Sequence, residues 1–157
     1  MRLSLPLLLA AACAVDPAAQ DAHAYVSRLQ PALIENGFLA DRLLGLSARI
    51  YNKQADAATL DATWRSEIVP LAEHLHDQAS FVAAPSDWTK AHADLVDIWG
   101  DRAQAYRSLG RAIDEGDKAA WNEARELADS VKLREEEWFR TTNQRLSAHD
   151  LLVDAFP

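Results

Sequence analysis

The chain has 157 residues, 49% of them hydrophobic, which is enough for one domain with a hydrophobic core. It carries 16 Lys and Arg against 24 Asp and Glu, a formal net charge of −8, which argues against nucleic acid or anionic lipid head groups as partners. The single cysteine excludes an internal disulfide.

The N-terminal segment is an apolar run that ends near this cysteine. After Arg2 comes the run LSLPLLLAAACAV, which is too short for a transmembrane helix of about 20 apolar residues. A secretory signal, with about 7 to 15 apolar residues before a small-residue exit, fits its length. We therefore predict that residues 1–12 are a signal peptide.

The sequence Ala-Ala-Ala-Cys at residues 10–13 resembles the lipobox of bacterial lipoproteins, in which the cysteine is lipidated and becomes the new N-terminus. The resemblance implies a lipid anchor on Cys13 that holds the protein outside the cytoplasm. Because Ala14 rather than Asp follows the cysteine, it also implies the outer membrane in a two-membrane organism. The alternative is an ordinary cleaved signal, cut after Ala12 or near residues 22–24, which releases a secreted or periplasmic soluble protein.

The next residues lead into the first predicted helix. Residues 16–23 lack apolar periodicity, so we expect residues 13–23 to be the lipid anchor and tether and residues 24–157 to be the folded domain. Hydrophobic residues at helical spacing predict a first helix over about residues 31–53. A polar connection follows, in which Thr59 is the expected N-cap of the second helix.

Three further helices are predicted downstream. The second helix has an apolar stripe over residues 60–82, and Pro70 inside it predicts a kink just before the proline. Ser86 is the expected N-cap of the third helix. Gly116 is expected to end that helix in the left-handed conformation, and Asp117 to cap a fourth helix.

The connections between these helices predict how they pack. Those at Pro85 and Gly116 are one or two residues long, which forces consecutive helices to lie antiparallel. No alternating strand pattern and no repeat competes with the helical periodicity. The predicted fold is therefore all-α, an up-down antiparallel bundle of four helices.

The search for catalytic and metal-binding motifs is mostly negative. The sequence has no nucleophile elbow, dinucleotide fingerprint, P-loop or Cys-x-x-Cys, so we expect no catalytic residue and no enzyme activity. Glu73 and His76 have the Glu-x-x-His spacing of di-iron bundles, but both point away from the apolar stripe of their helix. We expect a solvated helix face there, with neither a metal nor another cofactor.

His92 lies in the middle of the apolar stripe of the third helix, where a hydrophobic residue is the rule. The register set by the hairpin turn between the third and fourth helices places it opposite Thr142. Because a buried polar group needs a partner, we expect a core histidine that is hydrogen-bonded to Thr142 or Gln78.

Glu135 lies at the centre of the fourth stripe, and the same register places it opposite Trp99, with Arg102 one turn away. We expect Glu135 and Arg102 to form an ion pair in the core. A polar pair inside a bundle is also where a ligand site would be built, so His92, Glu135, Arg102 and Thr142 are the candidate polar core or ligand-binding residues.

These features favour a non-enzymatic protein of the cell envelope, attached to a membrane through Cys13. Its expected role is binding or scaffolding, directed at a small ligand or at a protein partner in the envelope. The alternative is a metal- or cofactor-binding four-helix bundle that uses His92 and Glu135.

Overall fold

A computed structural model of the chain describes residues 16–54 and 56–153. The helices are α1 (Pro17–Tyr51), α2 (Ala57–Thr63), α3 (Val69–Ser80), α4 (Thr89–Glu115) and α5 (Lys118–Leu146). A π-helical turn, Trp64–Ile68, joins α2 to α3, and short 3₁₀ turns lie at Ser86–Trp88 and Ser147–His149. These residues contain no β-strand.

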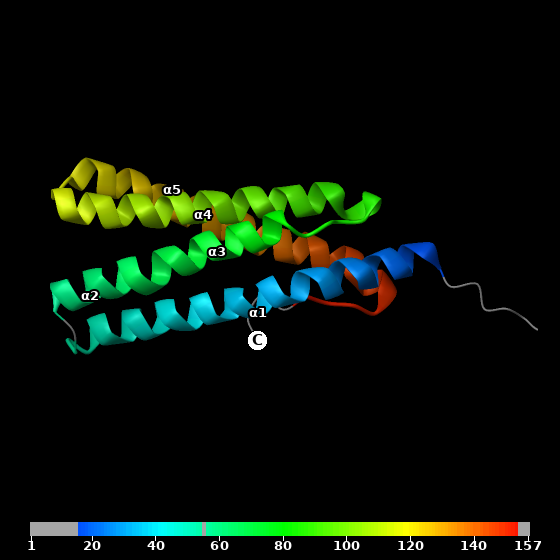
Figure 1. The fold of residues 1–157 in the computed structure, drawn as a ribbon, viewed down its shortest axis with the longest axis horizontal. Helices are drawn as coiled ribbons and strands as arrows, with labels where there is room; N and C mark the ends of the chain where they lie inside the picture. Colours follow the sequence, from blue (N-terminus) through cyan, green and yellow to red (C-terminus); the bar gives the residue numbers. More distant parts are fainter. Residues whose placement is uncertain (1–15, 55, 154–157) are drawn as a thin grey trace, which may run out of the picture.

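Figure 1 shows four long limbs that run alternately in opposite directions: α1, then α2 continued by α3, then α4, then α5. The second limb lies against both α1 and α4, and α4 and α5 form a closely packed hairpin. The fold is therefore an all-α antiparallel helical bundle, which confirms the predicted class. In the part of the chain described, none of the helices is both apolar and long enough to cross a bilayer.

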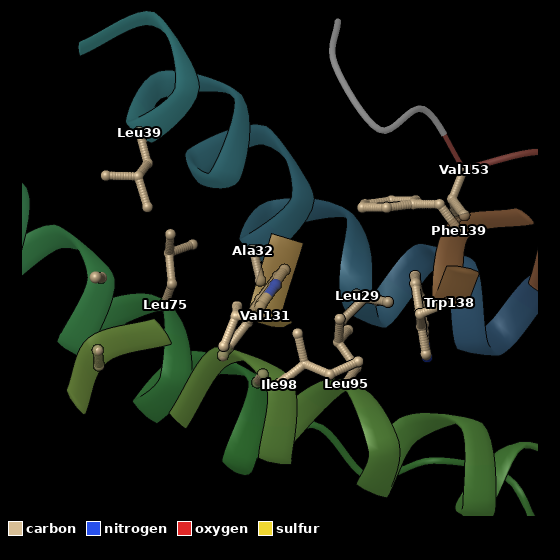
Figure 2. Packing of buried hydrophobic residues seen from close by; sticks show 14 of the residues in the cluster. Leu29, Ala32, Leu39, Leu75, Leu95, Ile98, Val131, Trp138, Phe139 and Val153 are labelled. Carbon is tan, nitrogen blue, oxygen red and sulfur yellow. The ribbon is translucent and has the colours of Figure 1, made fainter. Parts of the chain in front are cut away.

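Side chains from all four limbs build the core. Figure 2 shows hydrophobic residues of α1, α3, α4 and α5 pointing into a shared interior. The largest fully buried side chains are those of Trp99, Tyr25, Leu29, Leu39, Ile68, Leu75, Leu95, Leu146, Val131 and Thr142. Two residues of the predicted apolar stripes lie outside this core, at one end of the bundle: Ile50 of α1 and Ile113 of α4 are 54% and 50% exposed.

The first helix begins earlier than the sequence predicts. Residues 16–23, expected to be an irregular tether, are helical from Pro17 onward, and the Asp16 carboxylate caps the helix by accepting the N–H of Ala18 at 3.1 Å. Proline is favourable at the first helical position because its missing N–H would be unpaired there anyway. Ala22 is fully buried, so the folded domain starts at α1 rather than at residue 24. The predicted signal peptide and the anchor residue lie outside the described residues.

The second limb is irregular just before Pro70, where the sequence predicts a kink and the structure has a π-helical turn. This residue has no N–H to donate, and just before it the N–H of Val69 bonds to the carbonyl of Trp64, the spacing of a π-helical turn. The predicted N-cap was wrong. Asp56 caps α2, because its carboxylate accepts the N–H of Thr59 at 2.8 Å.

The two remaining connections differ in how well the sequence predicts them. Ser86 does not cap α4; it opens a 3₁₀ turn, and α4 begins at Thr89 without a side-chain cap. Gly116 does end α4, with φ +62°. Asp117 then caps α5 by accepting two backbone N–H groups of its first turn at 2.9 and 3.0 Å. This confirms the predicted hairpin turn.

Two glycines provide a matched test of these local assignments. Gly116→Ala should lower the free energy of unfolding by about 1 kcal/mol, because a residue with a Cβ is strained in the left-handed conformation. Gly45→Ala should raise it by about 0.5 to 1 kcal/mol, since Gly45 lies inside α1 with nothing within 4 Å of an added Cβ. Urea unfolding followed by circular dichroism measures both. Changes of the same sign would contradict the assignment.

Candidate functional site

A cleft lies between α1 on one side and α4 and α5 on the other. Along the chain each limb packs closely on the next, whereas α1 and α5 approach each other little. In Figure 1 the end of α5 that follows the hairpin turn lies far from α1. The cleft has a volume of about 570 Å³, within the range of small-molecule pockets. Its apolar wall is formed by Leu39, Ala40, Leu43, Leu44, Ala128 and Val131.

Polar groups gather in the lining of this cleft around Glu135. Its Oε1 accepts hydrogen bonds from Trp99 Nε1 at 2.8 Å and from Asn36 Nδ2 at 3.4 Å. Arg102 Nη1 donates to Oε1 and Oε2 of Glu135 at 3.0 and 3.2 Å. The side chains of Arg102 and Glu135 are 6% and 17% exposed. The structure thus contains the ion pair and the neighbouring tryptophan that the hairpin register predicts.

The guanidinium of Arg102 is only partly used by these contacts. Its Nε and Nη2 are buried and have no hydrogen-bond partner among the described residues, and the same holds for Oδ1 of Asn36. Cζ of Arg102 lies 5.2 Å from the centroid of the Trp99 ring, a cation–π contact. A buried unpaired polar group costs about 1 to 3 kcal/mol, so native proteins contain few of them. Unused N–H donors and an unused carbonyl acceptor are therefore buried in the wall of the cleft.

Tyr106 lies beside this pair in the cleft lining. Burial raises the pKa of its hydroxyl; the positive charge of Arg102 opposes that rise and the negative charge of Glu135 adds to it. The hydroxyl is therefore protonated at neutral pH and can donate a hydrogen bond. The second limb holds Tyr106 in place, because Trp64 Nε1 donates to its carbonyl at 2.9 Å and the two rings lie 5.1 Å apart.

His92 occupies different surroundings. It is 8% exposed, with Nε2 3.0 Å from the carbonyl oxygen of Ala79 and Nδ1 3.5 Å from the hydroxyl of Tyr25. It is a buried histidine, as expected, but the predicted partners Thr142 and Gln78 were wrong. The ring turns toward α3 and α1, whereas the hairpin register describes only how α4 faces α5.

The predicted site residues do not form one site. Arg102 and Glu135 line the cleft, whereas His92 and Thr142 are not in its lining. Thr142 is 1% exposed within the core. Gln78 donates to Oε1 of Glu35 at 3.0 Å. The Arg102–Glu135 pair therefore lines the cleft, whereas His92 contributes to the packing of α4 against α3 and α1.

The Glu-x-x-His pair lies at the surface. Oε1 of Glu73 accepts a hydrogen bond from Arg107 at 2.6 Å, and the imidazole of His76 packs against Gly100, whose added Cβ would lie 3.1 Å from it. Their side chains are 40% and 37% exposed. Within residues 16–54 and 56–153, no group of three or more His, Cys, Asp or Glu side chains is arranged to hold a metal ion.

Burial gives His92 a testable effect on stability. Desolvation lowers the pKa of His92 below its ordinary value, and the carbonyls of Ala79 and Val82 oppose this shift. The unfolded chain therefore binds this proton at a higher pH than the folded chain. The contribution to stability is complete above about pH 6.5 and is lost as the pH falls toward the folded-state pKa.

His92→Gln should accordingly flatten the loss of stability between about pH 6.5 and 5, measured by urea unfolding at several pH values. His23 is exposed at the start of α1, so His23→Gln is the matched control and should retain the wild-type slope. An unchanged slope in His92→Gln would contradict the assignment.

Sequence reasoning missed two residues of the cleft. Asn36 is a polar residue within the apolar stripe of α1, between Ala32 and Leu39, and that interruption is the signal that could have identified it. Tyr106 gave no such signal, because an aromatic residue on an apolar stripe predicts packing.

The chain was also compared with family models, with curated proteins and with solved structures, and it matches none of them.

Proposed function

We propose that this protein is a non-enzymatic binding domain that takes a small, largely apolar molecule into the cleft between α1, α4 and α5. One observation carries the proposal: Arg102 is buried in the lining of a cleft of about 570 Å³, with two guanidinium nitrogens unpartnered among the described residues. Unpaired buried donors destabilise a protein, and a ligand that supplies acceptors would remove that cost. The aliphatic wall suits the body of such a ligand.

We also propose that the domain is held outside the cytoplasm by a lipid on Cys13, at the outer membrane of a two-membrane organism. The support is the lipobox-like sequence at residues 10–13 and the signal-like run before it. Since α1 begins at Pro17, three residues separate it from Cys13. At about 3.3 to 3.6 Å per residue, such a link would keep the domain near the membrane. An ordinary cleaved signal would instead release it.

The binding proposal is tested by filling the cleft. Ala40 lines it, whereas Ala48 is exposed on the same helix and is not in its lining. Ala40→Phe should weaken binding of the neutral fluorescent probe N-phenylnaphthylamine about tenfold or more, and the matched variant Ala48→Phe should bind like the wild type. Circular dichroism checks that both variants fold. Equal binding by all three proteins, or none by the wild type, would overturn the proposal.

A further inference from the structure

The unpartnered nitrogens of Arg102 indicate what kind of polar group the ligand carries. In a guanidinium, Nη2 lies on the same side as the Nε hydrogen, so Nε–H and one Nη2–H point the same way and form a fork. This fork matches the two oxygens of a carboxylate. In Arg102, Glu135 engages Nη1 only, and both members of the fork remain unpartnered within the described part of the chain.

We infer that the ligand is an apolar carboxylate whose two oxygens accept the Nε–H and Nη2–H of Arg102, an inference that rests on the proposed binding function. A neutral carbonyl or hydroxyl offers a single oxygen, which cannot form the two parallel, charge-assisted hydrogen bonds that a carboxylate forms with the fork. The aliphatic side chains of the cleft wall then cover the rest of the molecule: those of Leu39, Ala40, Leu43, Leu44, Ala128 and Val131.

The charges that face the cleft are compatible with a second carboxylate. The cations Arg102 and Lys132 balance the anions Asp129 and Glu135, so the cleft has no excess negative charge that would repel a carboxylate. Trp99 and Asn36 also donate to Glu135, so its charge does not depend on Arg102 alone. Arg102 can therefore share its charge between Glu135 and a ligand.

Burial of the fork strengthens such an interaction. Folding has already removed Nε and Nη2 from water, so binding does not incur their desolvation a second time, and the hydrogen bonds form in a low-dielectric environment. Because both nitrogens are covered in the free protein, ligand entry requires a side-chain adjustment of the kind that commonly accompanies binding.

The test compares decanoate with decanol on the full chain, by displacement of N-phenylnaphthylamine. We expect wild-type protein to prefer decanoate about tenfold or more. Arg102→Lys keeps the charge and removes the fork, so it should abolish the preference while decanol still binds. The matched control is Arg134→Lys, because Arg134 pairs with Asp101 between the same two helices and is not in the cleft lining. It should keep the preference.

The outcomes separate the two proposals. Equal binding of decanoate and decanol by wild-type protein would overturn the carboxylate inference and leave the binding function standing, whereas binding of neither would overturn the function. If Arg102→Lys still prefers decanoate over decanol, charge alone attracts the ligand, and the inference that the fork of Arg102 binds a carboxylate is overturned. If Arg102→Lys fails to fold, the Nε–H NMR signal of Arg102 in wild-type protein decides: decanoate should shift it and decanol should not. An unmoved signal overturns the inference.

Discussion

Glu135→Gln should lower the free energy of unfolding by about 3 kcal/mol, the largest loss of stability expected from a single polar substitution in this protein. The carboxylate balances the charge of Arg102, whose side chain is 6% exposed, and it also accepts a hydrogen bond from Trp99. Without it the guanidinium remains in a low-dielectric environment with no opposite charge. Because Glu135 itself is 17% exposed, we expect the lower end of the range for buried pairs. Urea unfolding at neutral pH measures the change.

Two variants show whether this loss comes from a stranded charge. Asp101→Asn breaks an ion pair with Arg134 between the same two helices, but both side chains are about 40% exposed, so the cost should stay below about 1 kcal/mol. Combining Glu135→Gln with Arg102→Met removes the stranded charge, so the double variant should be more stable than Glu135→Gln alone. If Glu135→Gln costs no more than Asp101→Asn, the pair is not the buried interaction described above.

Cys13→Ala should move the protein from the membrane fraction to the soluble fraction, or leave it unprocessed, when it is expressed in a bacterial host. The lipoproteins that this segment resembles carry two or three acyl chains, and each buried CH₂ contributes about 0.8 kcal/mol to membrane attachment, so loss of the lipid should be decisive. Cell fractionation and the mass of the mature protein measure the change.

A second variant of the same segment serves as the control. In the lipoproteins that it resembles, Asp directly after the cysteine favours the inner membrane. Ala14→Asp should therefore remain attached to membranes but move from the outer to the inner one in a two-membrane host. Equal fractionation of the wild type and Cys13→Ala, with the same mature mass, would end the proposal of a lipid anchor.

The features that could be predicted from the sequence depend on interactions between residues close along the chain. Gly116 and Asp117 mark the turn between α4 and α5 because their conformational and capping preferences are local. Once that turn is known, helical geometry alone places Glu135 opposite Trp99 and near Arg102. The ion pair could be predicted for this reason, although it joins residues 33 positions apart.

The features that only the tertiary structure decided involve limbs that no short turn connects. Asn36 of α1 reaches Glu135 across 99 positions, and His92 meets Tyr25 across 67, because of how α1 lies against the hairpin of α4 and α5. No turn sets the register of that contact, so periodicity shows which face of α1 is buried but not what it faces. The sequence by itself therefore determined the four helical limbs, their antiparallel order and the Arg102–Glu135 pair, but not where α1 begins or which residues cap α2 and α4. The cleft and the contact between His92 and Tyr25 follow from packing between distant segments, which depends on the shapes of many side chains at once.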